Sequence, residues 1–206
     1  RRQRQMCIRD RNEQESLALI TQMIQNSKKG LVVGSGNSFL FWGYLTLAVS
    51  IAIFLLLYIT GNQSWFWLGI VIPVIGCLYT YWVSRRNGKK TMSYVDKVIS
   101  NVWQIVGGTC AIIALLALNY GNNIAILPLL LLVLSVGAGI TGSVIQEKSF
   151  YNCSAFGIAI SLGMLFNINS IVEGPLRQVF AFALAITVVM IIPGHMVNRK
   201  AKRSNV

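Results

Sequence analysis

Long stretches of this 206-residue chain contain no charged side chain. Residues 30–84 and 98–146 are uncharged runs of 55 and 49 residues, and two shorter uncharged runs cover residues 149–172 and 178–198. Soluble helices and strands alternate polar and apolar faces, so runs this long and apolar exclude a water-soluble core. A membrane-spanning helix needs about 20 mostly apolar residues. Two spans fit each longer run and one span fits each shorter run, which predicts an all-α membrane protein with six transmembrane helices.

The residue patterns that mark most membrane enzymes and ion-coupled transporters are also missing. The uncharged runs contain no Asp or Glu for proton coupling, and the chain has no Walker A sequence, zinc-ligand helix or acidic cluster for phosphoalcohol transfer. Its four cysteines show no CxxC or Cys/His spacing, and none lies in a predicted outer turn. We therefore expect a non-enzymatic protein without a disulfide framework, a cofactor or a metal.

The charge that is present lies between the apolar runs, and it is mostly positive, with 18 Lys and Arg against 6 Asp and Glu. Beyond residues 1–11, twelve of the 13 basic residues lie on alternate connectors, and only Arg177 lies on the other side. This positive-inside bias places both termini, the 84–101 loop and the 146–149 turn on the cytoplasmic side of the membrane. The basic excess indicates contact with anionic inner-leaflet lipids and not with nucleic acid.

The six spans are expected to form a bundle of three hairpins within a membrane domain of residues 30–198. The outer turns are expected at residues 60–64, 119–123 and 167–175. Residues 92–101 are amphipathic and are expected to continue into the third span. The predicted spans cover about residues 39–59, 65–83, 102–118, 124–145, 150–166 and 176–197.

Aromatic and proline residues add two further expectations about these spans. All five Trp residues fall at predicted span ends, where aromatic belts lie in membrane proteins. Pro73, Pro128 and Pro193 each lie in a returning span, at different depths, and predict separate kinks.

The termini are expected to lie outside the spans. Residues 1–11 closely resemble a translated sequencing-adaptor fragment, which makes residues 1–12 a non-native arm; the alternative is a genuine basic arm on the membrane surface. In residues 13–29, apolar side chains recur at three- and four-residue spacing opposite Glu, Gln and Thr, which predicts an amphipathic helix on the inner leaflet or against the bundle. Residues 199–206 form a basic cytoplasmic tail.

The fourth and fifth spans carry small residues at four-residue spacing, which predicts close packing of these helices, since apolar side chains gain little from leaving lipid for protein. The alternative is a polar-lined permeation path, but no ionisable residue joins it. Leu131 and Leu132 are expected to face lipid. The predicted packing residues are Ser135, Gly139, Gly142 and Ser143 in the fourth span, and Gly157 and Ser161 in the fifth.

Three polar residues are the remaining candidates for a functional site. Glu173 and Arg177 are the only charges expected on the outer side, and they flank a Gly-Pro pair. They predict a helix start with a local ion pair, or else an outer ligand site. His195 lies one turn from Arg199 and is predicted to cap or anchor the inner end of the last span.

The segment Gly139-Ile140-Thr141-Gly142 superficially resembles the GxSG motif of rhomboid proteases, which have six core spans and a histidine in the sixth. Thr141 stands where those proteases have the nucleophilic Ser, and the His and Asn of their oxyanion site have no counterpart in residues 65–83. Acyl transfer needs an activated nucleophile and aimed donors. An intramembrane enzyme is therefore the least favoured function.

The chain carries an ESL-x-x-I-x-x-MI pattern from Glu15 to Ile24, followed by FLxWGY from Phe39 to Tyr44 and by Ile72-Pro73-Val74-Ile75-Gly76. Residues 13–85 thereby resemble a family of small uncharacterised bacterial inner-membrane proteins. This resemblance implies no activity, ligand or site residue.

From these observations we expect an accessory, structural or sensory membrane protein that acts through its amphipathic helix and its basic loops. It would do so as a homo-oligomer or with a membrane-protein partner. The alternative is a small uncoupled transporter or channel that acts as an oligomer.

Overall fold

The computed structural model describes residues 35–86, 94–120, 126–166 and 175–204. Within them the chain is almost entirely helical, and six helices are long and apolar enough to cross a membrane. The prediction of an all-helical chain with six apolar helices is therefore confirmed. The predicted N-terminal arm (1–12), the amphipathic helix (13–29) and Glu173 lie outside the described residues.

Two of the six spans are built from more than one helical type. A 3-10 helix and α3 form the second span, while α8, a π-helical turn and α9 form the sixth. In chain order the elements are α2 (Ser35–Thr60), η1 (Gln63–Ile70), α3 (Val71–Arg86), α4 (Tyr94–Tyr120), α5 (Ile126–Ile145), α6 (Lys148–Phe166), α8 (Pro175–Ile186), η3 (Thr187–Ile191) and α9 (Ile192–Ser204).

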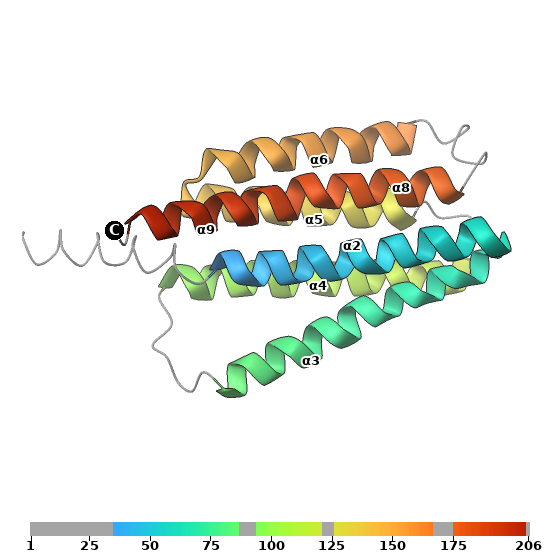
Figure 1. Cartoon of the computed structure of the whole chain (residues 1–206), viewed down its shortest axis with the longest axis horizontal. Helices are drawn as coiled ribbons and strands as arrows, with labels where there is room; N and C mark the ends of the chain where they lie inside the picture. Colours follow the sequence, from blue (N-terminus) through green and yellow to red (C-terminus); the bar gives the residue numbers. More distant parts are fainter. Residues whose placement is uncertain (1–34, 87–93, 121–125, 167–174, 205–206) are drawn as a thin grey trace, which may run out of the picture.

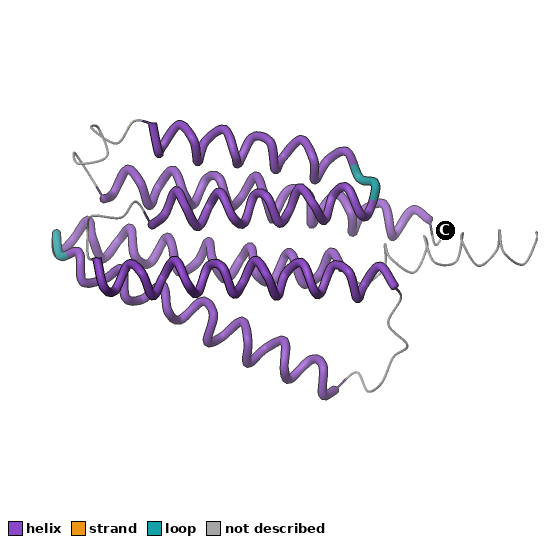
Figure 2. Tube along the Cα trace, turned by 180° about the vertical axis from the view of Figure 1, so that it is seen from behind, coloured by secondary structure: helices purple, strands orange, loops and turns teal. Residues whose placement is uncertain are grey.

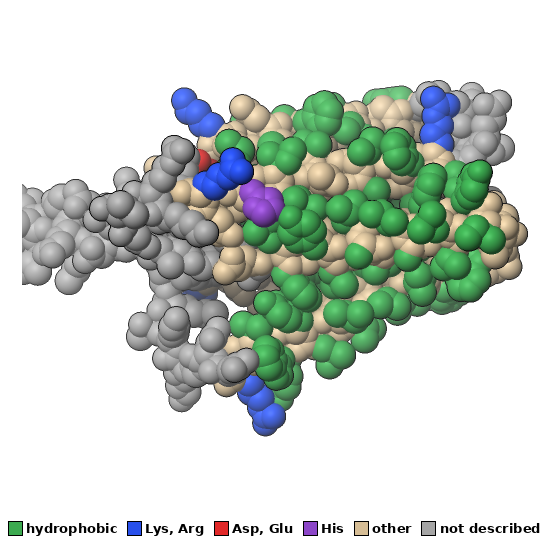
Figure 3. Space-filling view, viewed as in Figure 1, with side chains coloured by type: hydrophobic (Ala, Val, Ile, Leu, Met, Phe, Trp, Pro, Cys, Tyr) green, Lys and Arg blue, Asp and Glu red, His purple; other side chains and the backbone are tan. Residues whose placement is uncertain are grey.

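The helices lie side by side along the long axis of the molecule, and both ends of the described chain lie at the same end of the bundle (Figures 1 and 2). We call this the basic end, because Arg85, Lys97, Lys148 and Arg199 lie near the helix termini found there. Arg177, in the first turn of α8, lies at the opposite end. The space-filling view shows apolar side chains between the two ends, as the hydrocarbon core of a membrane requires (Figure 3).

Helix packing in the bundle is uneven. The most extensive contact joins α5 and α6, followed by the contacts of α2 with α8 and of α4 with α5. α3 contacts chiefly α2 and η1, and it diverges from α2 toward its Arg86 end (Figure 1). Only 6% of the most apolar stretch of Gln63–Val83 is buried, against 50% for Pro175–Arg199. The first and sixth spans and the fourth and fifth spans thus form the packed part of the molecule, and α3 lies at its edge.

The main core forms where α5 meets α8 and η3, and Leu131, Ala138, Ala185 and Val189 are fully buried in it. The expectation that Leu131 faces lipid is therefore wrong, while Leu132 is half-buried. Leu131 lies four residues before Ser135, on the α5 face that packs against α6, because residues i and i+4 share a helix face. α5 is apolar all round, so its hydropathy alone does not distinguish a lipid-facing leucine from a buried one.

The three prolines predicted to kink their spans differ in their local helix geometry. Pro193 is fully buried, and the π-helical turn η3 precedes it, with the N–H of Ile192 bonded to the carbonyl of Thr187 five residues back. A proline ring clashes with the carbonyl four residues earlier, and the wider π turn relieves that clash. Pro73 lies just after the change from η1 to α3. Pro128 lies in the first turn of α5, where a proline removes no helical hydrogen bond, so the predicted kink there is wrong.

An aromatic cluster joins α2, α4 and α6 near the basic end. The ring of Phe39 makes edge contacts with Trp103 and with Phe150, each at a centroid distance of 5.1 Å. Val197 of α9 completes this cluster, and Phe150 is 1% exposed. Trp103 therefore packs inside the bundle, whereas Trp65, Trp67 and Trp82 are exposed at span ends, as expected of a belt.

Replacing Phe150 by Ala should destabilise the protein strongly, because it removes a side chain that touches Phe39 and leaves a cavity. Such changes cost about 3–5 kcal/mol in packed cores. Phe156→Ala is the matched control on the same helix, since Phe156 is 53% exposed and its removal leaves no enclosed space. The midpoint of thermal unfolding in detergent should fall clearly for the first variant alone. Similar midpoints for the two variants would contradict the cluster.

Candidate functional site

The seam between α5 and α6 contains most of the residues that the sequence singled out. Ser135 and Ser161 have no exposed surface, and Gly142 and Gly157 are buried. The hydroxyl of Ser161 donates a hydrogen bond to the carbonyl of Pro128 at 2.7 Å, which links α6 to the start of α5. This seam is the most extensive helix contact of the bundle.

The glycines of the seam lie where a side chain has no room. A Cβ at Gly142 would lie 2.6 Å from the Cβ of Phe150 and 3.0 Å from the backbone N of Tyr151. A Cβ at Gly157 would overlap both Ser135 Oγ and Val189 Cγ2, and one at Gly139 would lie 2.7 Å from Ser154 Oγ. Because backbone and short side chains cannot move aside, the absence of a side chain sets the distance between the two helices.

Ser143 departs from the prediction that it packs between helices. Its side chain is exposed, and its hydroxyl donates to the carbonyl of Gly139 in its own helix at 3.1 Å. Ser143 follows Gly139 at the predicted four-residue spacing, but it lies on the exposed side of the last turn of α5, whereas its neighbour Gly142 packs against Phe150. It borders a surface hollow instead.

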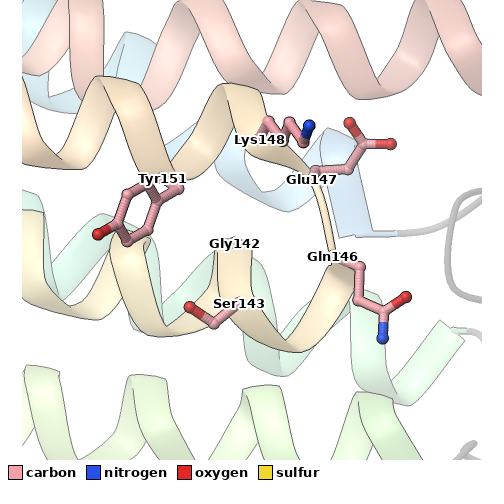
Figure 4. A pocket seen from close by; sticks show the side chains of 6 residues that line it. All are labelled: Gly142, Ser143, Gln146, Glu147, Lys148 and Tyr151. Carbon is pink, nitrogen blue, oxygen red and sulfur yellow. The ribbon is translucent and has the colours of Figure 1, made fainter.

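That hollow lies on the turn between α5 and α6 and has a volume of about 210 Å³. Gln146 adopts a left-handed backbone conformation there, with φ of 59°, and the N–H of Glu147 bonds to the carbonyl of Gly142 at 3.0 Å. Gln146, Glu147 and Tyr151 extend in different directions from the turn (Figure 4). The hollow therefore has polar walls but no set of converging groups that could hold a ligand.

Thr141, the residue at the position of the rhomboid serine, is buried and fully engaged in packing. Its hydroxyl donates to the carbonyl of Gly137 at 2.8 Å and accepts a hydrogen bond from the indole N–H of Trp103 at 3.2 Å. These bonds satisfy a polar group in an apolar interior and fasten α4 to α5. A base that would activate this hydroxyl is not among its partners, so it has the role of a packing residue.

His195 connects the first span to the last. Its Nε2 lies 2.7 Å from the hydroxyl of Tyr44 in α2, and both side chains are exposed on the bundle surface. Further toward the basic end, the side-chain amide of Asn198 donates to that of Asn37 at 2.9 Å. Of the two roles expected of His195, capping or anchoring the end of the last span, this bond to a neighbouring helix fits the second. No spacing rule in the sequence links residue 44 to residue 195.

Arg177 lies in the first turn of α8, with its side chain exposed at the end opposite the basic end. Since Glu173 lies outside the described residues, the predicted ion pair between them stays a prediction. In the described part of the chain, no group of three or more His, Cys, Asp or Glu side chains could hold a metal ion.

Ala substitutions at Gly142 and Gly157 should lower stability, because each new Cβ must push α5 and α6 apart. Overpacking of this kind typically costs about 1–3 kcal/mol. Gly108→Ala is the control: a Cβ there meets nothing within 4 Å in a helix of the same membrane domain. Unfolding midpoints in detergent should fall for the two seam variants and stay unchanged or rise for the control, and an equal response at all three positions would refute close packing at the seam.

Comparison of the chain with family models, with curated proteins and with solved structures gives no match. The case for a function therefore depends on the geometry of the described residues.

Proposed function

We propose that this chain is a non-enzymatic, multi-pass membrane protein with an accessory, structural or sensory role. One observation carries this proposal: the charged side chains that the structure describes lie near the two ends of the bundle, and the interior between them is filled by packed side chains. Leu131, Ala138, Ile186 and Val189 have no exposed surface. Transport and catalysis both need polar groups that face a substrate or a water-filled path, whereas the core clusters in the described part of the chain consist of packed apolar side chains.

We further propose that the six spans form three helix hairpins in a bacterial inner membrane and that both termini lie in the cytoplasm. The asymmetry of charge supports this topology. Arg85, Lys97, Lys148 and Arg199 lie at the basic end, and Arg177 lies at the other. Membrane proteins retain such basic segments on the cytoplasmic side, and anionic lipids attract them there. The resemblance of residues 13–85 to small bacterial inner-membrane proteins favours the same location.

In this proposal the packed spans hold a cytoplasmic surface in place. That surface consists of the amphipathic segment of residues 13–29, the basic loop between α3 and α4, and the basic tail of residues 199–206. An amphipathic helix with cations at its C-terminal end suits contact with anionic lipid or with another membrane protein. Partner contact at this surface would give the chain its accessory or sensory role.

The alternative function, an oligomeric transporter or channel, is supported by the exposed faces of α3 and α4. Only 11% of the most apolar stretch of Lys97–Ala117 is buried, and a Cβ at Gly107 or Gly108 would meet open space. Small residues on a lipid-facing helix allow a second helix to approach closely. Association of copies through these faces would be the first step toward a pore.

Cysteine labelling should place the basic end in the cytoplasm. Single cysteines at Ser64, Asn122 and Ser170, in a chain with its own cysteines replaced, should react with an impermeant maleimide from outside spheroplasts, because the positive-inside bias puts these positions outside. A cysteine in place of Asn87 is the control and should react only after the inner face is opened. The reverse pattern would overturn the topology.

Two measurements separate the accessory role from the transport alternative. A photoreactive residue at Gln22, on the polar side of the amphipathic segment, should cross-link one discrete membrane protein in native membranes, whereas the same group at Met23, on the apolar side, should label lipid. Charge reversal at Lys89 and Lys90 should lower the protein cross-link. In liposomes, the purified chain should leave the permeability to ions and small solutes at the protein-free level, and saturable protein-dependent flux would instead establish the transport alternative.

A further inference from the structure

A groove with a volume of about 240 Å³ runs between α2 and α8 on the surface of the bundle. Ser50 and Val179 form its floor, since both are buried, while Ile51 and Leu184 are about half exposed and form its rims. An enclosed apolar cavity of roughly 150 Å³ already binds a molecule the size of benzene. The groove is therefore large enough for several methylene groups.

The groove covers only part of the membrane thickness. Its lining on α8 runs from Val179 to Thr187 in η3, which is about 12 Å at 1.5 Å per residue, and a hydrocarbon core is roughly 30 Å thick. Beyond Thr187 the two spans close on each other, because a Cβ at Gly43 would lie 3.0 Å from Ile191 Cγ1. The groove thus begins near the Arg177 end and stops close to the middle of the bilayer.

The depth of the groove indicates whether a transmembrane helix or a lipid acyl chain can occupy it. A transmembrane helix of a partner or of a second copy needs a contact face that can continue across both leaflets. An acyl chain belongs to one leaflet and ends near the bilayer middle. The half-depth groove, lined toward the Arg177 end by the contacting rings of Phe54 and Phe180 at a centroid distance of 6.1 Å, has the length of the second kind of occupant.

A cation lies at the end of the groove that faces the headgroups. Arg177 is two residues before Val179, it is exposed, and it shares a helix side with the rim residue Leu184 seven positions later. A guanidinium group binds phosphate oxygens in a bidentate manner. An apolar chain in the groove and a phosphate at Arg177 are the two parts of one phospholipid.

We propose that the α2–α8 groove is a specific binding site for a phospholipid of the leaflet at the Arg177 end, with its acyl chain along the groove over the paired rings of Phe54 and Phe180 and its phosphate at Arg177. This inference rests on the proposed location of the chain in a membrane. The lipid fills the α2–α8 groove beside the π-helical turn and thereby completes the packing of the first span against the last.

The site can be tested with phosphatidylglycerol that carries a photoreactive diazirine in its acyl chain. With the full chain in vesicles of this lipid and phosphatidylethanolamine, a diazirine at the chain end should label peptides around Ser50 and Thr187. A diazirine near the ester should label peptides around Phe54 and Val179. Ala183→Phe fills the groove and should lower this labelling severalfold, and Arg177→Gln should lower lipid retention by about tenfold through loss of a charge-assisted hydrogen bond.

Ala159→Phe is the matched control, because Ala159 is exposed on α6 outside the groove. It should leave labelling of the groove unchanged, and unaltered unfolding midpoints would show that Ala183→Phe still folds. Equal labelling of α3, α4, α6 and the groove would mean bulk boundary lipid and would overturn the site, as would copy-to-copy disulfides through a cysteine at Ile51 that exclude the lipid. Failure of the chain to insert into vesicles would contradict the proposed function as well, whereas uniform labelling of an inserted chain contradicts this site alone.

Discussion

The close approach of α5 and α6 is the constraint on which the rest of the bundle depends. In lipid, helices gain little from burying apolar side chains, so contact must come from fitted surfaces and hydrogen bonds. The absence of side chains at Gly142 and Gly157 lets the two helices approach closely, and the hydrogen bond from Ser161 to the carbonyl of Pro128 links them. Because Gly157 also lies against Val189 of η3, the same seam sets the position of the sixth span. The sixth span in turn carries the contacts to α2.

The π-helical turn follows from this arrangement and from one proline. Pro193 cannot donate a hydrogen bond and displaces the carbonyl four residues before it, so the helix must widen or bend. Widening occurs at Thr187–Ile191, in the most buried span of the bundle, where Val189 and Met190 fill the core. This turn separates two parts of the sixth span, α8 and α9, which contact α2 in different ways. α8 leaves a groove toward α2, while α9 meets α2 through the bond between His195 and Tyr44.

The sequence was enough to predict the six apolar helices, because a span is a property of one continuous segment and is defined by its hydropathy. It was less informative about which side of a span faces protein. Leu131 and Leu132 are chemically identical neighbours, yet one is fully buried and the other half-buried, and Ser143 follows the packing register but is exposed. The Tyr44–His195 pair joins residues 151 positions apart. Such pairings depend on how whole helices are placed, which local spacing does not encode.

The uneven packing of the bundle bears on what the chain can do. A transporter needs two packings of similar free energy around a polar site. In this bundle the most extensive contact, between α5 and α6, is fixed by glycines and by a buried hydroxyl bond that leave little freedom to slide. α3 packs less extensively: it contacts chiefly α2 and η1, and the rings of Phe41 and Tyr79 stack at a centroid distance of 3.6 Å. Since α3 leads directly into the basic loop, a movement of α3 would displace the basic end of the bundle before it reached the core, which agrees with the proposed signalling or accessory role.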